Sequence, residues 1–184
     1  MGVKLEAAED QWRVWMEARF MQPAATAPVP GAERTLLCGG LWSDGELRAF
    51  SKKEWLALGL DWGEFEKKAR LLSDVDLEKV EIRYDRDARQ VIRFAEVRCR
   101  APLVASAVLS PKFGDRFLDT LGEGLFVAVP NRYQAFVFPK VMGFPVQYTG
   151  MILGGYDATA FPVSVELFEY SKGMLKAVGM FQQP

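Results

Sequence analysis

The sequence contains no histidine, and this absence excludes more chemistry than any other feature of its composition. Neutral histidine is the commonest metal ligand, and it is the side chain that titrates near neutral pH without help from its surroundings. Ser-His-Asp triads, Cys-His pairs and histidine-bearing zinc sites are therefore excluded. We expect no metal site, no cofactor and no catalytic residue of these classes.

Cysteine is also scarce, with only Cys38 and Cys99, and neither belongs to a Cys-x-x-Cys motif. A disulfide between them has no motivation in a reducing compartment. Cys38 precedes Gly39 and Gly40, which would allow a ligand to approach the backbone. A buried, inert thiol is nevertheless the favoured interpretation of Cys38.

The chain has no long apolar run and no excess of one charge. No run approaches the roughly 20 residues that cross a bilayer, and the start, Met-Gly-Val-Lys-Leu-Glu, lacks the apolar core of a signal peptide. Lys and Arg number 23 against 24 Asp and Glu, so no overall field attracts nucleic acid or anionic lipid. These features predict a cytoplasmic protein without a nucleic-acid or membrane partner.

The length of 184 residues suits one ordinary domain with a small appendage. Apolar residues between Leu5 and Phe20 recur every three or four positions, which predicts an amphipathic helix. The segment from Pro23 to Gly31 contains three prolines and reads as an extended linker. We therefore divide the chain into a helical arm with a Pro/Ala-rich linker, residues 1–33, and a single α+β domain, residues 34–184.

The clearest structural signal is a hairpin between Leu125 and Phe138. Two short apolar runs, rich in Val and Phe, flank the polar sequence Pro-Asn-Arg-Tyr. Continuous apolar runs of this length are typical of strands that are covered on both faces. Pro130 and Asn131 suit the corner positions of a turn. The sequence therefore predicts a buried antiparallel pair at the centre of the fold.

A second hairpin is predicted between Val80 and Arg100, where apolar and charged residues alternate. The alternation changes phase after Phe94, which indicates a bulge near Ala95 or Glu96. The six arginines of this stretch suggest phosphate binding, but four acidic residues are interleaved with them. A solvated ladder of cross-strand charges is the favoured interpretation.

Local motifs place the helices. Ser51 with Glu54, and Asp61 with Glu64, have the spacing of a capping box, and the second of these helices is expected to end near Leu72. A third helix is predicted from Ser110, its N-cap, to Gly122 or Gly124. A fourth is predicted over residues 146–153 and is ended by two glycines. Three apolar residues form the buried stripe of the third helix: Phe113, Phe117 and Leu121.

A turn at Ser171–Lys172–Gly173 leads into a last strand, residues 174–181. Together these elements predict an α+β fold, with a mostly antiparallel sheet, helices packed on one face and a helical N-terminal arm.

Several local strings, in the order found here, are shared with a known family: Trp55-Leu-Ala-Leu-Gly-Leu, the helix from Glu64 to Arg70, the element from Ala105 to Leu121 entering Val-Ala-Val-Pro130, Gly155-Tyr-Asp157, and the closing stretch from Phe161 to Leu175. Through these strings and the order of its elements, the chain resembles the YtpQ-like family of uncharacterised bacterial proteins over residues 50–181. The resemblance implies an α+β fold and a cytoplasmic setting, and it supplies no catalytic residues. The chain is short for this family, so the N-terminal portion of longer relatives is missing or replaced.

The first candidate binding residues are Asn131, Arg132 and Tyr133, at the tip between the two buried strands. A rigid hairpin presents such residues outward, and arginine suits recognition of a carboxylate or phosphate. Good turn chemistry with a solvated arginine is the alternative. A second group lies around Gly154-Gly155: Tyr156 offers a ring, Asp157 a carboxylate, and Lys140 is expected nearby once the sheet closes.

The sequence therefore favours a non-catalytic module that binds a protein or a small anionic ligand. Two alternatives from other classes stay open. One is an enzyme without histidine, a hydrolase or transferase that uses Asp157, Lys140 and Ser164. The other is a homo-oligomer, assembled through an edge strand or through the Trp12 and Trp15 face of the arm.

Overall fold

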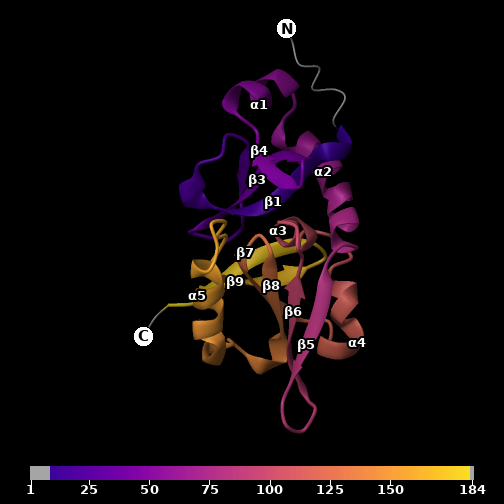
Figure 1. The fold of residues 1–184 in the computed structure, drawn as a ribbon, viewed down its shortest axis with the longest axis vertical. Helices are drawn as coiled ribbons and strands as arrows, with labels where there is room; N and C mark the ends of the chain where they lie inside the picture. The colour runs from indigo at the N-terminus through magenta and orange to yellow at the C-terminus, as the bar shows by residue number, and fades with distance from the viewer. Residues whose placement is uncertain (1–8, 183–184) are drawn as a thin grey trace.

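The computed structural model describes residues 9–182 and has an α+β fold with two antiparallel sheets (Figure 1). The first sheet has the order β1-β3-β2, with β4 paired to β3. The second has the order β10-β9-β7-β8-β6-β5. The strands are β1 (Trp12–Ala18), β2 (Thr26–Pro28), β3 (Thr35–Ser43), β4 (Glu46–Ala49), β5 (Glu81–Arg86), β6 (Ile92–Arg98), β7 (Leu125–Asn131), β8 (Gln134–Pro139), β9 (Glu166–Ser171) and β10 (Met174–Met180).

The predicted N-terminal helix is wrong over residues 12–18, which form β1. All seven residues of β1 are buried, because the strand pairs with β3 and packs against helices. A stretch that is buried on both faces shows no strand alternation, so its apolar residues matched helical spacing by chance. The start of the predicted helix, residues 5–8, lies outside the described residues. The predicted linker contains β2, which also pairs with β3, so the predicted boundary at residue 33 falls within one sheet.

Helices α1 (Lys52–Leu58) and α2 (Trp62–Leu77) begin where their capping residues predicted. The Ser51 hydroxyl accepts a hydrogen bond from the Glu54 amide, and the Glu54 carboxylate accepts one from the Ser51 amide. The Asp61 carboxylate accepts from the Glu64 amide. Helix α2 continues to Leu77, beyond the predicted end at Leu72.

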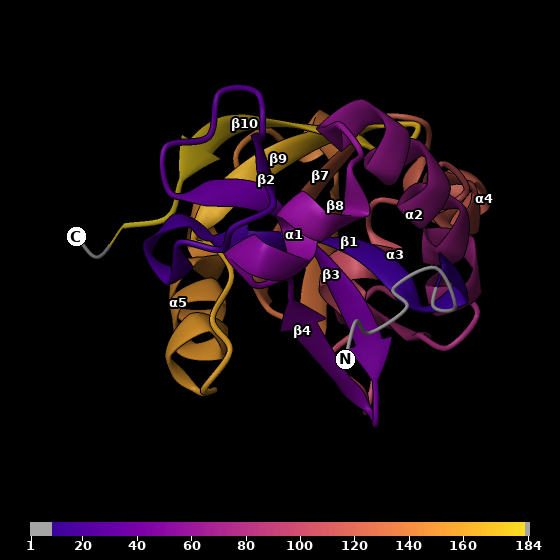
Figure 2. The ribbon, with the colours of Figure 1, turned by 90° about the horizontal axis from the view of Figure 1, so that it is seen from above.

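Helices cover both faces of the second sheet, so the prediction of helices on one face is wrong. Val127 and Val137 point to the side of Phe113 and Phe117, whereas Ala128 and Phe136 point to the side of α5 (Thr149–Asp157). In both views α5 and α4 (Leu118–Leu121) lie on opposite sides of the molecule (Figure 2). The predicted buried hairpin is confirmed, and burial of both faces explains its continuous apolar runs.

Two local predictions need correction. The register of β5 and β6 shifts between Asp85 and Arg86, which pair with Phe94 and Ile92, so the bulge is not at residue 95 or 96. The glycines at 154 and 155 lie inside α5 and do not end it. The turn at residues 171–173 is confirmed, because Lys172 and Gly173 have φ values of 48° and 79°.

The first sheet lies against the end of the second sheet where β7 turns into β8 (Figure 1). Between them is the short helix α3 (Val104–Ala107), which contacts β1, β7 and β8. One hydrophobic core spans both sheets, since Trp15 of β1 and Val127 of β7 belong to the same cluster. Among residues 9–182 no helix combines the length and apolar character needed to cross a membrane.

Candidate functional site

Arg132 is not presented outward as the sequence predicted, because the β7–β8 turn is inserted against the first sheet. The side chain is buried, with 6% of the residue exposed, and forms an ion pair with the buried Glu17 of β1. It also donates a hydrogen bond of 3.2 Å to the Leu47 carbonyl of β4. Its guanidinium carbon lies 5.5 Å from the Trp15 ring centroid and 4.9 Å from that of Phe161. Arg132 thus joins the two sheets and has no free fork for a ligand.

Asn131 is also buried and holds α5 in place. Its side-chain amide donates to the Gly155 carbonyl at 2.8 Å, and its side-chain oxygen accepts from the Tyr133 amide at 2.9 Å. The Tyr133 ring lies 6.3 Å from the ring of Phe161. The expected binding tip is therefore an anchor, and its main effect on a site is to fix Gly155 and the adjacent Tyr156.

The structure does not support the histidine-free enzyme, because Lys140 lies far from Asp157 and Ser164. The Lys140 amide is bonded to Gly124 just before β7 begins, whereas Gly155, near Asp157, approaches Pro130 near the end of that strand. The rise of a strand over the six residues from Gly124 to Pro130 separates these two ends by about 20 Å. Lys140 is instead paired with Glu169. Within the described residues no hydrogen bond joins Lys140, Asp157 and Ser164, and Lys140 is not a neighbour of the Tyr156 segment.

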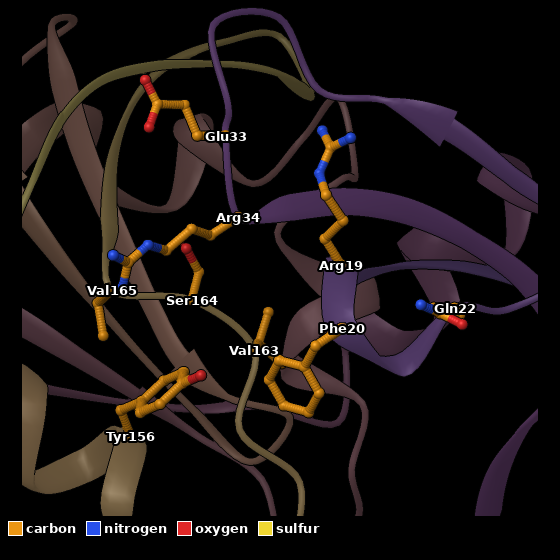
Figure 3. A pocket seen from close by; sticks show the side chains of 9 residues that line it. All are labelled: Arg19, Phe20, Gln22, Glu33, Arg34, Tyr156, Val163, Ser164 and Val165. Atoms are coloured by element: carbon orange, nitrogen blue, oxygen red, sulfur yellow. The ribbon is translucent and has the colours of Figure 1, made fainter.

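A hollow of about 440 Å³ opens where the first sheet, α5 and the segment before β9 come together (Figure 3). We call it the junction hollow. One side comes from the turn after β1 and from the residues just before β3, and the other from α5 and from the stretch leading to β9. Its lining residues are Arg19, Phe20, Gln22, Glu33, Arg34, Tyr156, Val163, Ser164 and Val165.

The base of the junction hollow is a saturated hydrogen-bond network that joins the two sheets. The buried Glu166 carboxylate accepts from the Glu33 amide at 2.7 Å and lies 2.5 Å from the Thr35 hydroxyl oxygen. The Thr35 hydroxyl has one hydrogen, and it donates this hydrogen to the Glu166 carboxylate, the stronger acceptor. In the 2.7 Å contact between the Thr35 and Ser164 hydroxyls, Ser164 is therefore the donor. The Ser164 oxygen also accepts from the Glu166 amide at 2.9 Å. Ser164 is therefore occupied structurally and is not poised as a nucleophile.

Two arginines lie at paired backbone positions on the rim of this hollow, and their side chains extend in different directions (Figure 3). The β1–β3 register pairs Ala18 with Thr35, and the Arg19 amide continues it by donating to the Arg34 carbonyl at 2.8 Å. Like charges directly opposite each other on paired strands are destabilising. In the described part of the chain neither guanidinium forms an ion pair, and Arg19 donates only to the Ala32 carbonyl. The pair is thus left without a counter-charge in contact.

Among the described residues, the carboxylates near this hollow form no ion pair with Arg19 or Arg34. Glu33 is the one carboxylate in the lining, and its side chain points away from Tyr156 while Arg34 reaches toward it (Figure 3). The Glu166 carboxylate lies below and is already bonded by backbone and hydroxyl donors. Burial raises the pKa of Tyr156, Arg34 opposes that shift, and Asp157 adds to it. The phenol is therefore neutral at physiological pH and has a hydrogen to donate.

Other parts of the described chain offer weaker sites. A hollow of about 280 Å³ is lined by Arg83, Arg98 and Arg100, but the first two are paired with Glu81 and Glu96. Residues 9–182 contain no group of three or more acidic or cysteine side chains placed to hold a metal ion. The junction hollow thus combines space with two arginines that form no ion pair in the described part of the chain.

Of the predicted binding residues, only Tyr156 lines the junction hollow, together with Ser164 of the enzyme alternative; Arg19, Phe20 and Arg34 were missed. The missed signal is the pairing of residues 12–18 with residues 35–43. Once both stretches are assigned as antiparallel strands, joined through a turn and β2, Arg19 falls opposite Arg34 by register alone. Because the N-terminal residues were predicted to be a helix, they were not paired with residues 35–43, and Arg19 was not placed opposite Arg34.

No family model matches the chain, and no curated protein or solved structure matches it either. The resemblance to the YtpQ-like family therefore stays a prediction, and function is argued from the site alone.

Proposed function

We propose that this protein binds a small anionic ligand, a carboxylate or a phosphate, in the junction hollow, and that it acts as a binding module without catalysing a reaction. The observation that carries the proposal is that two arginines line this hollow, Arg19 and Arg34, and that neither has a counter-ion among the described residues. An anion bound in the hollow would supply a counter-charge and would gain charge-assisted hydrogen bonds from an arginine.

The size and the remaining donors of the hollow support this proposal. A volume of about 440 Å³ lies in the usual range for small-molecule sites, about 300–1,000 Å³. Tyr156 supplies a neutral hydroxyl that can donate to an anionic oxygen. Ser164, the nearest hydroxyl of a potential nucleophile, is committed to Thr35 and Glu166. These groups suit recognition and leave no activated nucleophile for covalent catalysis.

The test is a titration with inorganic phosphate and with acetate, followed by two-dimensional NMR of the backbone amides. We expect the amides of residues 33–35 and 163–165 to shift in a saturable way. Arg34→Met should weaken the affinity about tenfold, because it removes a charged, two-pronged donor and keeps the length of the side chain.

Arg89→Met is the matched control, because Arg89 is an exposed arginine of the β5–β6 turn, far from this hollow. It removes the same charge and should leave the affinity unchanged. Equal affinities of Arg34→Met and wild type, or saturable shifts centred elsewhere, would refute the proposed site.

A further inference from the structure

We infer that the ligand of the junction hollow carries a planar aromatic group beside its anionic head, as an aryl carboxylate or an aryl phosphate does. The inference rests on the proposed anion site and specifies the other half of the ligand. The side chains around the hollow are unevenly distributed: the charged groups lie on one side and the aromatic rings on another.

The aromatic side is formed by Phe20 and Tyr156, which come from opposite walls. Phe20 follows β1 in the short turn Arg19–Met21, which ends with Gln22 in a left-handed conformation. This turn holds the Phe20 ring at the rim with 61% of the residue exposed. Tyr156 projects from α5, and its hydroxyl points toward the Phe20 ring (Figure 3). Two rings from distant segments therefore share one open space.

The wall beside the rings is apolar, and in Figure 3 its two valine side chains are drawn on the same side of the rings as the arginines. Val163 and Val165 line the hollow and are buried against the body of the protein. The guanidinium groups of Arg19 and Arg34 lie above the two rings in Figure 3. A ligand that occupies both regions must have an apolar body and an anionic head. A free phosphate or acetate ion would fill the charged region only.

An aromatic body fits this arrangement better than an aliphatic one. A flat ring can stack against or meet the edge of both Phe20 and Tyr156, and aromatic pairs attract each other beyond the area they bury. The Phe20 side chain makes few packing contacts within the protein, since most of its surface is exposed. A ring bound beside it would bury that surface.

The experiment compares phenyl phosphate with cyclohexyl phosphate and inorganic phosphate, using the same NMR titration. The two esters have equal charge and similar size, so their difference reports aromaticity. We expect phenyl phosphate to bind about fivefold more tightly than cyclohexyl phosphate. Phe20→Leu should remove most of that preference and should leave the affinity for inorganic phosphate unchanged.

Leu71→Ala, which truncates an apolar side chain 73% exposed on α2, controls for general changes of the surface. Because the Phe20 side chain is largely exposed, we expect Phe20→Leu to have the melting temperature of the wild type. An unchanged melting temperature shows that a difference in affinity does not come from a loss of folding.

The outcomes separate the two proposals. Equal affinities for both esters, together with binding that needs Arg34, would overturn the aromatic specificity and leave the anion site standing. A preference for phenyl phosphate that needs Phe20 and is indifferent to Arg34→Met would keep the aromatic slot and refute the anion site. Absence of saturable binding by all three probes at millimolar concentration would refute both.

Discussion

At the scale of single residues, Arg132 shows how burial changes the meaning of a turn residue. An arginine in a Pro-Asn-Arg-Tyr turn would normally be solvated. Here its partner Glu17 lies on a strand 115 positions earlier in the sequence, and both side chains are enclosed. The Glu17 carboxylate also accepts from the Trp15 indole at 2.9 Å and from the Ala18 amide at 3.0 Å. The pair is thus part of a buried polar network at the contact of the two sheets.

We predict that Arg132→Met lowers the free energy of unfolding by about 3 kcal/mol, because it leaves a buried carboxylate without its cation. Chemical denaturation monitored by tryptophan fluorescence measures the change. The double variant Glu17→Gln with Arg132→Met should recover part of the loss, since the uncompensated charge is then removed. A stability of Arg132→Met equal to that of the exposed control Arg89→Met would show that the ion pair is not structural.

An exposed ion pair contributes less to the free energy of unfolding than the buried pair of Glu17 and Arg132. Arg48 of β4 holds both carboxylate oxygens of Glu54 at 2.9 Å, and the pair stands at the start of α1. The hydrogen bond with Arg48 comes first among the causes that lower the pKa of Glu54 from 4.5 to about 2, and hydrogen bonds with Ser51 add to it. Since the folded pKa lies below the unfolded one, the charge stabilises the protein above pH 4.5 and ceases to do so as the pH falls through about 2.

Glu54→Gln tests this pH dependence, because glutamine keeps the capping hydrogen bond and removes only the charge. We predict a loss of about 0.5 kcal/mol at pH 6, a small value because solvent screens the pair. The difference between variant and wild type should disappear near pH 2. NMR titration of the Glu54 side-chain carboxyl carbon gives the pKa directly, and a midpoint above 4 would contradict the assignment.

At the scale of elements, α5 carries glycines with opposite surroundings. A Cβ added at Gly154 would meet no atom within 4 Å, whereas one added at Gly155 would lie 3.2 Å from Pro130 and 3.1 Å from the Gln134 side-chain oxygen. Gly155 therefore allows α5 to approach β7, where its carbonyl is held by Asn131. Gly154 has no such role.

We predict that Gly154→Ala stabilises the protein by about 0.5–1 kcal/mol, because alanine restricts the unfolded chain and suits a helix interior. Gly155→Ala is the matched change within the same turn of helix, and it should be neutral or destabilising. Thermal unfolding compares the two. A greater stabilisation by Gly155→Ala than by Gly154→Ala would show that α5 does not rest on β7 as described.

Elements with local signals were predictable from the sequence, and those defined by distant contacts were not. The capping pairs at Ser51 and Asp61 act within one turn, so they located two helix starts correctly. The hairpin around Pro130 was also recognisable, because a turn and its flanking strands are contiguous. In contrast, β1 is defined by pairing with β3 across an intervening turn and strand, and it has no alternating pattern.

The same reasoning explains which site residues were found. Tyr156 was selected for its own chemistry and does line the junction hollow, whereas Arg19 and Arg34 acquire meaning only when β1 and β3 are paired. Cys38 was interpreted correctly as a buried thiol, and burial raises its pKa well above the usual value. Single-residue properties were thus readable, but the juxtaposition that makes the site was not.

At the scale of the whole molecule, the N-terminal segment is an integral part of the fold, and several contacts bind the two sheets together. Glu17 pairs with Arg132, the Thr35 and Ser164 hydroxyls meet at 2.7 Å, and the Ala177 amide donates to the Pro30 carbonyl at 2.8 Å. The apolar core is also continuous between the sheets. These links imply that neither sheet is stable alone.

The distribution of tryptophan allows a direct test of this dependence. All five tryptophans precede residue 63 and belong to the first sheet and to α1 and α2, so their fluorescence reports mainly the N-terminal part. Far-UV circular dichroism reports the backbone of both parts. We predict coincident denaturation curves from the two probes, because a molecule with a shared core unfolds in one transition.

Ser164→Ala strengthens the test, since Ser164 lies in the segment before β9 and contacts the first sheet through Thr35. Its loss should lower the midpoint seen by fluorescence and the midpoint seen by circular dichroism equally, by an amount that corresponds to about 2 kcal/mol for its two buried hydrogen bonds, with Thr35 and from the Glu166 amide. If the first sheet were a separate unit, the two probes would give distinct midpoints and this substitution would move them unequally. Coincident shifts would also mean that a ligand held between the sheets, at the junction hollow, stabilises the entire chain.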